Sequence, residues 1–292
     1  MAKNTALKGR IRSVRNTRKI TKTMELVATS KLKRATDRVA AARPYAEALR
    51  DMLGDLVTPD LADRFPLLRT PAAPSKGGPA RAALILLTSN RGLAGAFNSN
   101  LIKEARRRLT VLEGEGYTVD LYTVGKKGAS FFRYLRRPIT VDRPDVGDKP
   151  EPRHAEEVVT PLIEAFERGE IGRVELVQAR FLSALSTPPT TIQILPIDPP
   201  KRKGPRPDYL LAPNADAILG QLLPLYVRNA VYRGLVETVA GEQGARRTAM
   251  KNATDNATDL LGLLQRTFNR QRQAAITQEI SEIVGGSAAL QG

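Results

Sequence analysis

The chain of 292 residues contains no cysteine, no tryptophan and a single histidine. The absence of cysteine excludes disulfide bonds, thiolate metal sites and cysteine nucleophiles, and a reducing compartment is then the default expectation. One histidine cannot form a multi-histidine metal site, and it leaves the commonest general base nearly unavailable. This residue, His154, lies in the polar stretch of residues 150–157. We therefore expect a solvated loop histidine there.

Long apolar runs are missing as well. No run approaches the roughly 18–20 residues that are needed to span a bilayer. The first residues, MAKNTALKGRIRS, lack the apolar core of a signal peptide. We therefore expect a cytoplasmic protein that is linked to any membrane only through partners.

Proline is absent from both ends of the chain. All twenty prolines lie between Pro44 and Pro224, and seventeen of them lie between Pro59 and Pro207. Because proline removes a hydrogen bond from a helix and clashes with the preceding turn, this distribution predicts two long helices around a different kind of domain. A helix over residues 225–292 would be roughly 100 Å long, and one over the first 43 residues roughly 65 Å long. Such helices must be covered by each other or by partners.

Apolar spacing predicts that these two helices form a coiled coil with an alanine-rich seam. At the N-terminus the apolar residues step by three or four within each of three sets, but by six and five between the sets, so we expect the register to slip twice. The sets are Leu7, Ile11 and Val14; Ile20, Met24 and Val27; and Leu32, Ala35, Val39 and Ala42. The C-terminal seam steps by three or four throughout, at Met250, Ala253, Ala257, Leu260, Leu264 and Phe268. Because both ends return from one central domain, we expect an antiparallel pair.

The middle of the chain predicts alternating strands and helices. We expect strands at residues 81–88, 117–124, 173–182 and 190–196, and helices at residues 101–112 and 155–168, the second kinked at Pro161 or starting near it. This succession favours right-handed βαβ units in a Rossmann-like layer. The predicted fold is α/β plus long helices: an antiparallel coiled coil of the N- and C-terminal helices with a central Rossmann-like α/β domain. The predicted domains are the N-terminal helix at 1–58, the α/β domain at 76–200 and the C-terminal helix at 208–292.

A glycine loop at residues 88–98 (TSNRGLAGAFN) is the strongest candidate for a cofactor site, because it joins a strand to a helix. It contains only Gly92 and Gly95, so neither the dinucleotide pattern nor the phosphate-loop pattern is present. The stretch GKKG at 125–128 is shorter and lacks the serine or threonine. We favour tight structural turns over ligand binding, and we expect no catalytic residue, no cofactor and no metal site.

The formal net charge of +16 is concentrated at the N-terminus, where residues 1–50 hold 14 Lys and Arg against three acidic residues. Such an excess favours an acidic partner. Nucleic-acid binding is less favoured, because the basic residues surround the helix and no aromatic residue is interleaved before Tyr45. Near the C-terminus, a polar band at 269–273 precedes the apolar residues Ile276, Ile280, Ile283 and Val284. We favour burial of this apolar tip in a sleeve over a frayed end, since exposed apolar surface promotes aggregation.

Three segments resemble the gamma subunit of the rotary F-type ATP synthase, in its bacterial form. They are LKGRIRSVRNTRKITKTMELVATSKLK at 7–33, SNRGLAG at 89–95 and RQRQAAITQEISEIVGGSAAL at 270–290. In the second segment, asparagine and alanine stand where the family usually has aspartate and cysteine. The resemblance runs from end to end of the chain, and its helix motifs are long enough to be specific.

The resemblance implies a central-stalk rotor that couples ion translocation to ATP synthesis or hydrolysis without being catalytic itself. It implies as partners three alpha and three beta subunits, the epsilon subunit and the membrane c-ring, at the cytoplasmic face of the bacterial inner membrane. By position, Met24 matches a methionine associated with coupling, and Tyr209 matches part of the foot toward the ring. Polar contacts with the beta subunits and within the shaft are implied for Arg246, Arg272, Gln273, Thr277, Glu279 and Glu282.

The sequence departs from the family at two places. Gly285, Gly286 and Ser287 replace the usual Ser-Gly-Ala, and Gly241 and Gly244 lie in a stretch that is normally richer in serine and alanine. Because a glycine inside a helix costs about 1 kcal/mol, we expect less rigid helix at both places. Two alternative functions stay open on the residues alone, a basic coiled coil that binds nucleic acid and a nucleotide-binding enzyme.

Overall fold

The computed structural model describes residues 2–57, 64–71, 74, 77, 80–199 and 214–289, with side chains described from residue 5 to residue 285. The chain forms two compact units. Unit 1 combines residues 1–28 and 247–292, and unit 2 is continuous from residue 29 to residue 246. The long helices α1 (Ala2–Leu56) and α6 (Ala215–Ala289) each contribute residues to both units.

The buried face of α1 follows a single heptad frame. From Leu7 to Leu56, steps of four and three in alternation reach buried or half-buried residues at every position except Arg18, and the frame passes through Thr21 and Ala28. The predicted slips of register are therefore wrong. Ile20 and Val27, which carried the predicted seam, are 59% and 51% exposed, whereas Thr21 and Ala28 are 8% and 1% exposed. The helix keeps its register by burying a threonine and an alanine in place of the larger apolar neighbours.

In unit 1, α1 and α6 pack as an antiparallel pair. Thr254 Oγ1 lies 2.8 Å from Thr21 Oγ1, and the Lys8 ammonium lies 5.6 Å from the centre of the Phe268 ring, so partner numbers rise on one helix as they fall on the other. The predicted antiparallel coiled coil is confirmed, but one seam residue is wrong. Leu260 is 45% exposed, and its neighbour Leu261 is buried instead.

Unit 2 contains a five-stranded sheet in the order β3-β2-β1-β4-β5. Its strands are β1 (Arg81–Leu87), β2 (Thr118–Val124), β3 (Val141–Arg143), β4 (Arg173–Ala179) and β5 (Pro189–Leu195). The first four run parallel, and β5 pairs antiparallel with β4. Strand β1 is apolar almost throughout, and it is buried on both faces, as expected for a central parallel strand.

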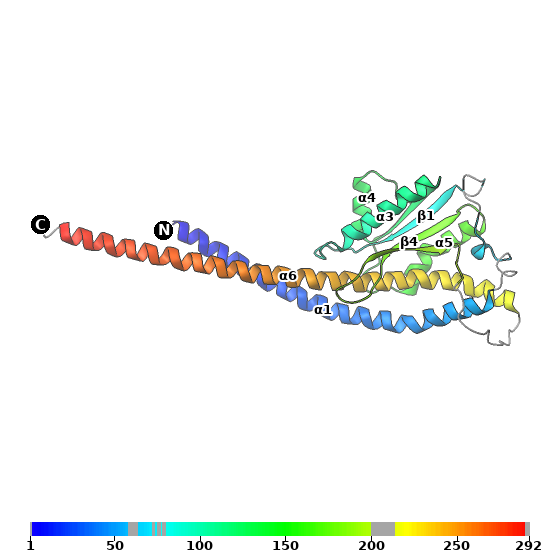
Figure 1. The fold of residues 1–292 in the computed structure, drawn as a ribbon, viewed down its shortest axis with the longest axis horizontal. Coiled ribbons are helices and arrows are strands. Elements are labelled where there is room, and N and C mark those ends of the chain that lie inside the picture. The colour runs from blue at the N-terminus through cyan, green and yellow to red at the C-terminus, as the bar shows by residue number, and fades with distance from the viewer. Residues whose placement is uncertain are drawn as a thin grey trace. The chain divides into compact units, whose positions relative to one another are not determined.

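Helices cover both faces of this sheet (Figure 1), and each face packs in its own apolar core. On one face pack α3 (Phe97–Gly114) and α4 (Lys126–Tyr134), which meet Leu84 and Leu86 of β1. On the other face pack α5 (Pro152–Glu167), the short 3-10 helix η1 (Pro66–Leu68) and the unit 2 parts of α1 and α6, which meet Ile85 and Leu87. The predicted α/β fold with long helices is thus confirmed.

Several local details differ from the prediction. Helix α4 and strand β3 were not predicted, because nine and three residues are too few for a periodic pattern to stand out. Helix α5 begins at Pro152 and runs through Pro161. A proline at the first helical turn loses no hydrogen bond, which makes Pro152 a favourable start.

Two glycines of α6 serve close packing. A Cβ atom on Gly241 would lie 3.1 Å from the Phe97 ring and 3.2 Å from Ala179 Cβ, and one on Gly244 would lie 2.9 Å from the Ala184 carbonyl oxygen. The helix is continuous at both positions. The expectation that these glycines loosen the helix therefore misses their role, which is to bring its backbone against the β4–β5 hairpin.

No helix within the described residues is long and apolar enough to cross a membrane.

Candidate functional site

The predicted contact residues fall into two groups, one in each unit. In unit 1, Met24 is half-buried on α1. The other members of this group are exposed on α6: Arg272, Gln273, Thr277, Glu279 and Glu282. Tyr209 lies outside the described residues, so its predicted place in a foot stays a prediction.

The exposed polar group on α6 is held mainly by its own helix. The Thr277 hydroxyl donates to the Gln273 carbonyl oxygen at 3.0 Å, and Gln278 Nε2 donates to Glu282 Oε1 at 2.9 Å. Arg272 and Glu279 are both exposed. The segment therefore offers charges of both signs to a partner.

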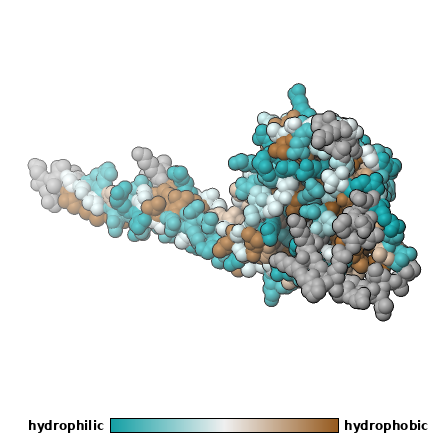
Figure 2. All heavy atoms as spheres, turned by 45° about the vertical axis from the view of Figure 1, so that its right-hand side comes forward, coloured by the Kyte–Doolittle hydropathy of each residue, from teal (hydrophilic) through white to brown (hydrophobic). Residues whose placement is uncertain are grey.

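Large apolar side chains are exposed beside these polar residues. On α6 they are Leu260, Leu263, Ile276, Ile280, Ile283 and Val284, and on α1 they are Ile20, Leu26 and Val27. Figure 2 shows hydrophobic atoms in separate patches along the coiled coil. Large exposed apolar patches are typical of surfaces that bind other proteins, ligands or membranes.

In unit 2, Arg246 binds the glycine loop to α6. Its Nη2 atom donates to Glu242 Oε1 at 2.6 Å and to the Gly92 carbonyl oxygen at 3.1 Å, and both side chains are buried. The pair is spaced i,i+4 on the helix, the spacing at which opposite charges meet. Burial raises the pKa of Glu242 above its ordinary value, and the Arg246 guanidinium opposes that rise.

A second ion pair joins α1 to the segment that follows β3. Lys31 Nζ pairs with Asp148 Oδ2, and Arg38 Nη1 donates to the Asp148 carbonyl oxygen at 3.1 Å. Burial opposes ionisation of Asp148, but the Lys31 ammonium outweighs it, so the pKa of Asp148 lies below its ordinary value. The carboxylate therefore stays charged at neutral pH and holds α1 against the α/β layer.

Asn90 closes the glycine loop against the loop after β3 and the N-terminus of α4. Its Nδ2 atom donates to the carbonyl oxygens of Pro144 and Val146 at 3.0 and 2.9 Å, and its Oδ1 atom accepts from the Lys126 amide at 2.9 Å. Both N–H donors of the carboxamide are used, and its oxygen accepts one hydrogen bond. Because a carboxylate cannot donate, this network explains why asparagine suits the position where the family resemblance leads one to expect aspartate.

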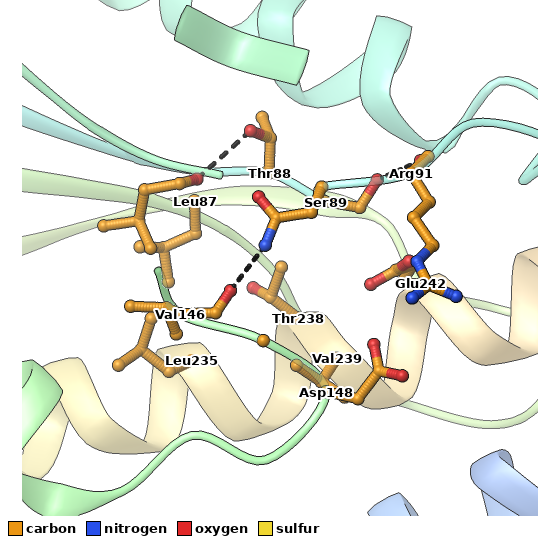
Figure 3. A pocket seen from close by; sticks show the side chains of 13 residues that line it. Leu87, Thr88, Ser89, Arg91, Val146, Asp148, Leu235, Thr238, Val239 and Glu242 are labelled. Atoms are coloured by element: carbon orange, nitrogen blue, oxygen red, sulfur yellow. Dashed lines mark hydrogen bonds between the residues drawn. The ribbon is translucent and has the colours of Figure 1, made fainter. Parts of the chain in front are cut away.

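The crevice beside the glycine loop lies at the carboxyl end of β1, near the point where the strand order reverses between β1 and β4. This is where doubly wound α/β folds place a ligand. In this chain α6 fills the crevice with Leu235, Thr238 and Glu242, and Figure 3 shows Arg91 extending toward Glu242. The remaining cavity is about 30 Å³, which is room for one or two water molecules. The loop is thus a structural turn that docks on α6.

His154 differs from the prediction. It is buried at 8% exposure near the start of α5, and its Nδ1 atom accepts a hydrogen bond from the Glu151 amide at 2.9 Å. The imidazole therefore caps a helix N-terminus and is not a solvated loop residue. Its sequence neighbourhood is polar, but Pro152, two residues before it, is a signal for a helix start.

Sequence reasoning also missed the partners of the predicted residues. Glu242 could have been found, since it lies four residues before Arg246. Asp148 and its partner Lys31 are 117 residues apart, and the sequence carries no signal for such a pair. Within the described residues, no group of three or more acidic, histidine or cysteine side chains is placed to hold a metal ion.

Comparisons with known proteins agree with one another. The sequence model of the family described as ATP synthase matches residues 3–290. The chain is 62% identical to the ATP synthase gamma chain of Gemmatimonas aurantiaca over 295 residues, which cover 100% of both chains. It is 42% identical to the ATP synthase gamma chain of Moorella thermoacetica over 292 residues, which cover 99% of this chain and 100% of the relative.

Solved structures resemble the fold of the whole chain. A chain from the cryo-EM structure of the Euglena gracilis mitochondrial ATP synthase, OSCP/F1/c-ring in rotational state 3, gives a TM-score of 0.70 at 20% identity. The match covers 99% of this chain and 95% of that one.

Proposed function

The chain belongs to the family of ATP synthase gamma chains, and from this premise we propose how its surfaces serve the complex. As the gamma subunit of an F-type ATP synthase, the protein is the rotor of the central stalk. It transmits rotation of the membrane c-ring to the head of alpha and beta subunits, and so couples ion translocation to ATP synthesis or hydrolysis. The observation that carries this function is the 62% identity to a gamma chain over the full length of both chains.

The exposed surface of unit 1 is the part proposed to enter the head of three alpha and three beta subunits. Ile276, Ile280 and Ile283 are exposed on α6 beside the charges of Arg272 and Glu279. Apolar side chains at this spacing gain free energy when a protein sleeve removes them from water. The polar residues then supply the contacts to beta subunits that the family resemblance implies.

Unit 2 is proposed to be non-catalytic and to meet the epsilon subunit and the c-ring, with Tyr209 in the foot. Two observations support a non-catalytic role. The only histidine of the chain is used in a helix cap, and the crevice at the sheet edge is filled by side chains of α6. The proposed location is the cytoplasmic face of the bacterial inner membrane, with membrane contact only through the complex.

Purification tests the assembly. We expect the tagged full chain, extracted from its own membranes in mild detergent, to carry alpha and beta subunits in a 3:3:1 ratio together with epsilon and the c-ring. A chain that elutes as a free monomer, apart from any large ATPase, would contradict the proposal.

Rotation can be tested directly because the natural chain has no cysteine. Lys103 is exposed on α3, so Lys103→Cys gives one labelling site for a bead on unit 2 of the intact complex. We expect the bead to turn in one direction when ATP is added to complexes fixed through the head, and to stay still without ATP. Hydrolysis by labelled complexes whose beads never turn would refute the rotor function.

A further inference from the structure

A second and larger cavity in unit 2 is left unexplained by the rotor function. It measures about 280 Å³ and lies where α1, α6 and the β4–β5 pair meet. Helix α6 lines it with one stripe of side chains, Tyr226, Asn229 and Arg233, at spacings of three and four. Arg50 enters from α1, and Arg180 follows the end of β4.

The cavity carries an excess of positive charge. Its only acidic lining residue, Glu237, is already bound twice: Oε1 pairs with Arg233 Nη2 at 3.1 Å, and Oε2 accepts from the Phe181 amide at 3.1 Å. Among the described residues, neither Arg50 nor Arg180 has an acidic partner within ion-pair distance. Three arginines and one glutamate leave a formal charge of +2 on the lining.

Such an arrangement favours a counter-charge. Like charges that face one concave surface repel each other, and low-dielectric walls concentrate their field, so the cavity attracts anions. Guanidinium groups are planar forks of N–H donors that match the oxygens of phosphate and carboxylate groups. A carboxylate has two oxygens, whereas a phosphate has four and can be reached by arginines from three elements at once.

We propose that this cavity binds an oxyanion of the phosphate class, inorganic phosphate or diphosphate, through Arg50, Arg180 and Arg233. The charge of monohydrogen phosphate matches the +2 of the lining. The volume suits one or two phosphate groups, and it lies just below the roughly 300–1,000 Å³ of pockets that enclose larger organic ligands. A bound phosphate joins α1, β4 and α6, and so braces the base of the long helices. This inference does not depend on the rotor function.

Protection from chemical modification tests the site in the unmutated chain. Phenylglyoxal modifies arginine side chains, and mass spectrometry of the full chain reports the rate at each arginine. At ten times its dissociation constant, a bound oxyanion should slow the modification of Arg50 and Arg180 about tenfold. Arg106, which is exposed on α3 outside the cavity, should react at an unchanged rate.

Separate ligands distinguish the sources of the phosphate group. Protection by phosphate or diphosphate, with none by ADP, indicates a free oxyanion, whereas stronger protection by ADP indicates the diphosphate of a nucleotide. Both results support the phosphate class. Equal rates for Arg50 and Arg180 with and without every one of these ligands overturn the proposal, as does equal protection of Arg106.

Variants provide an independent measurement. Arg50→Gln and Arg180→Gln should each weaken radiolabelled phosphate binding by the full chain about tenfold in equilibrium dialysis, because each removes a charged hydrogen-bond donor. The matched control Arg106→Gln makes the same change in net charge outside the cavity and should leave binding unchanged. Equal losses in all three variants show binding to the general positive charge and overturn the site.

Discussion

Asn90→Asp is the sharpest test of the loop architecture, because it changes one atom group and keeps the side-chain shape. In the wild-type chain, Nδ2 donates to the carbonyl oxygens of Pro144 and Val146, and Oδ1 accepts from the Lys126 amide. The substitution keeps the acceptor and removes both donations. It also places a carboxylate oxygen against two carbonyl oxygens.

The expected cost follows from these contacts. Two lost hydrogen bonds are worth about 1–3 kcal/mol together, and repulsion between the new carboxylate and the two carbonyls adds to this. We expect Asn90→Asp to lower the free energy of unfolding by about 2–4 kcal/mol at pH 7, measured by urea titration of the full chain. Asn90→Ala, which loses all three bonds without adding charge, is the matched control.

The pH dependence separates charge from shape. Two facing carbonyl oxygens disfavour the charged form, so the pKa of the new carboxyl group is raised in the folded chain above its value of about 3.9 in the unfolded chain. The native state then binds the proton more tightly, and the deficit of Asn90→Asp shrinks as the pH falls through that raised pKa. The deficit of Asn90→Ala should change little between pH 7 and pH 4. A loss below about 0.5 kcal/mol for Asn90→Asp at pH 7, or parallel pH profiles for the two variants, would refute this reasoning.

Three further outcomes are expected. Replacing Thr21 and Thr254 together by valine should keep or raise the melting temperature, because both members of a partly buried polar pair become apolar groups of the same shape. Spin-label distances between α1 and α6 should nevertheless broaden, since a polar contact in the seam fixes helix register. Glu242 binds its proton more tightly in the folded chain, so its contribution makes stability fall as the pH rises from about 4.5 through its raised pKa, and Glu242→Gln should remove this component from the difference profile in urea titrations. Met24→Lys should leave ATP hydrolysis by the complex intact but impair proton pumping, because it adds a charge at a half-buried place on the proposed shaft; hydrolysis assays and fluorescence quenching in membrane vesicles measure the two activities.

Each of these three predictions can be contradicted by a specific result. A melting temperature that drops in the double valine variant would show that the hydroxyl pair contributes net stability. Unchanged pH dependence in Glu242→Gln would show that this carboxyl group is not perturbed by burial. Normal pumping in Met24→Lys would count against the coupling role, and the exposed-site variant Lys103→Cys provides the baseline for both activities.

The architecture could be predicted because it depends on sequence patterns that extend over many residues, so that single exceptions do not obscure them. Proline-free ends and repeated apolar steps are spread over tens of residues, and the buried strand β1 is a continuous apolar run. The exact seam could not be predicted by hydrophobicity alone. At residues 20–21 the larger apolar side chain is outside and the threonine is inside, because the seven-residue frame is set by the whole helix and not by each residue.

The side-chain contacts within unit 2 could not be predicted from the sequence for a different reason. Asp148 meets Lys31 across 117 residues of chain, and Arg246 meets Gly92 across 154. Such pairs depend on how layers stack, which no local spacing records. The asparagine in the glycine loop is visible in the sequence, but its structural role depends on the carbonyl groups of Pro144 and Val146, more than 50 residues away, which lie opposite its amide.

The two glycines of α6 that face the β4–β5 hairpin bear on torque. A helix packed through side chains can roll a little about its own axis, because flexible groups exchange neighbours. Turning α6 by one residue position, about 100°, would replace Gly241 or Gly244 at the hairpin by a residue with a Cβ atom, where the space against Ala179 and the Ala184 carbonyl is already filled. Arg246, bound to the Gly92 carbonyl, opposes the same motion from the adjacent turn. Within unit 2, α6 therefore cannot rotate about its own axis relative to the α/β layer. A turning force on the layer is passed directly to the helix.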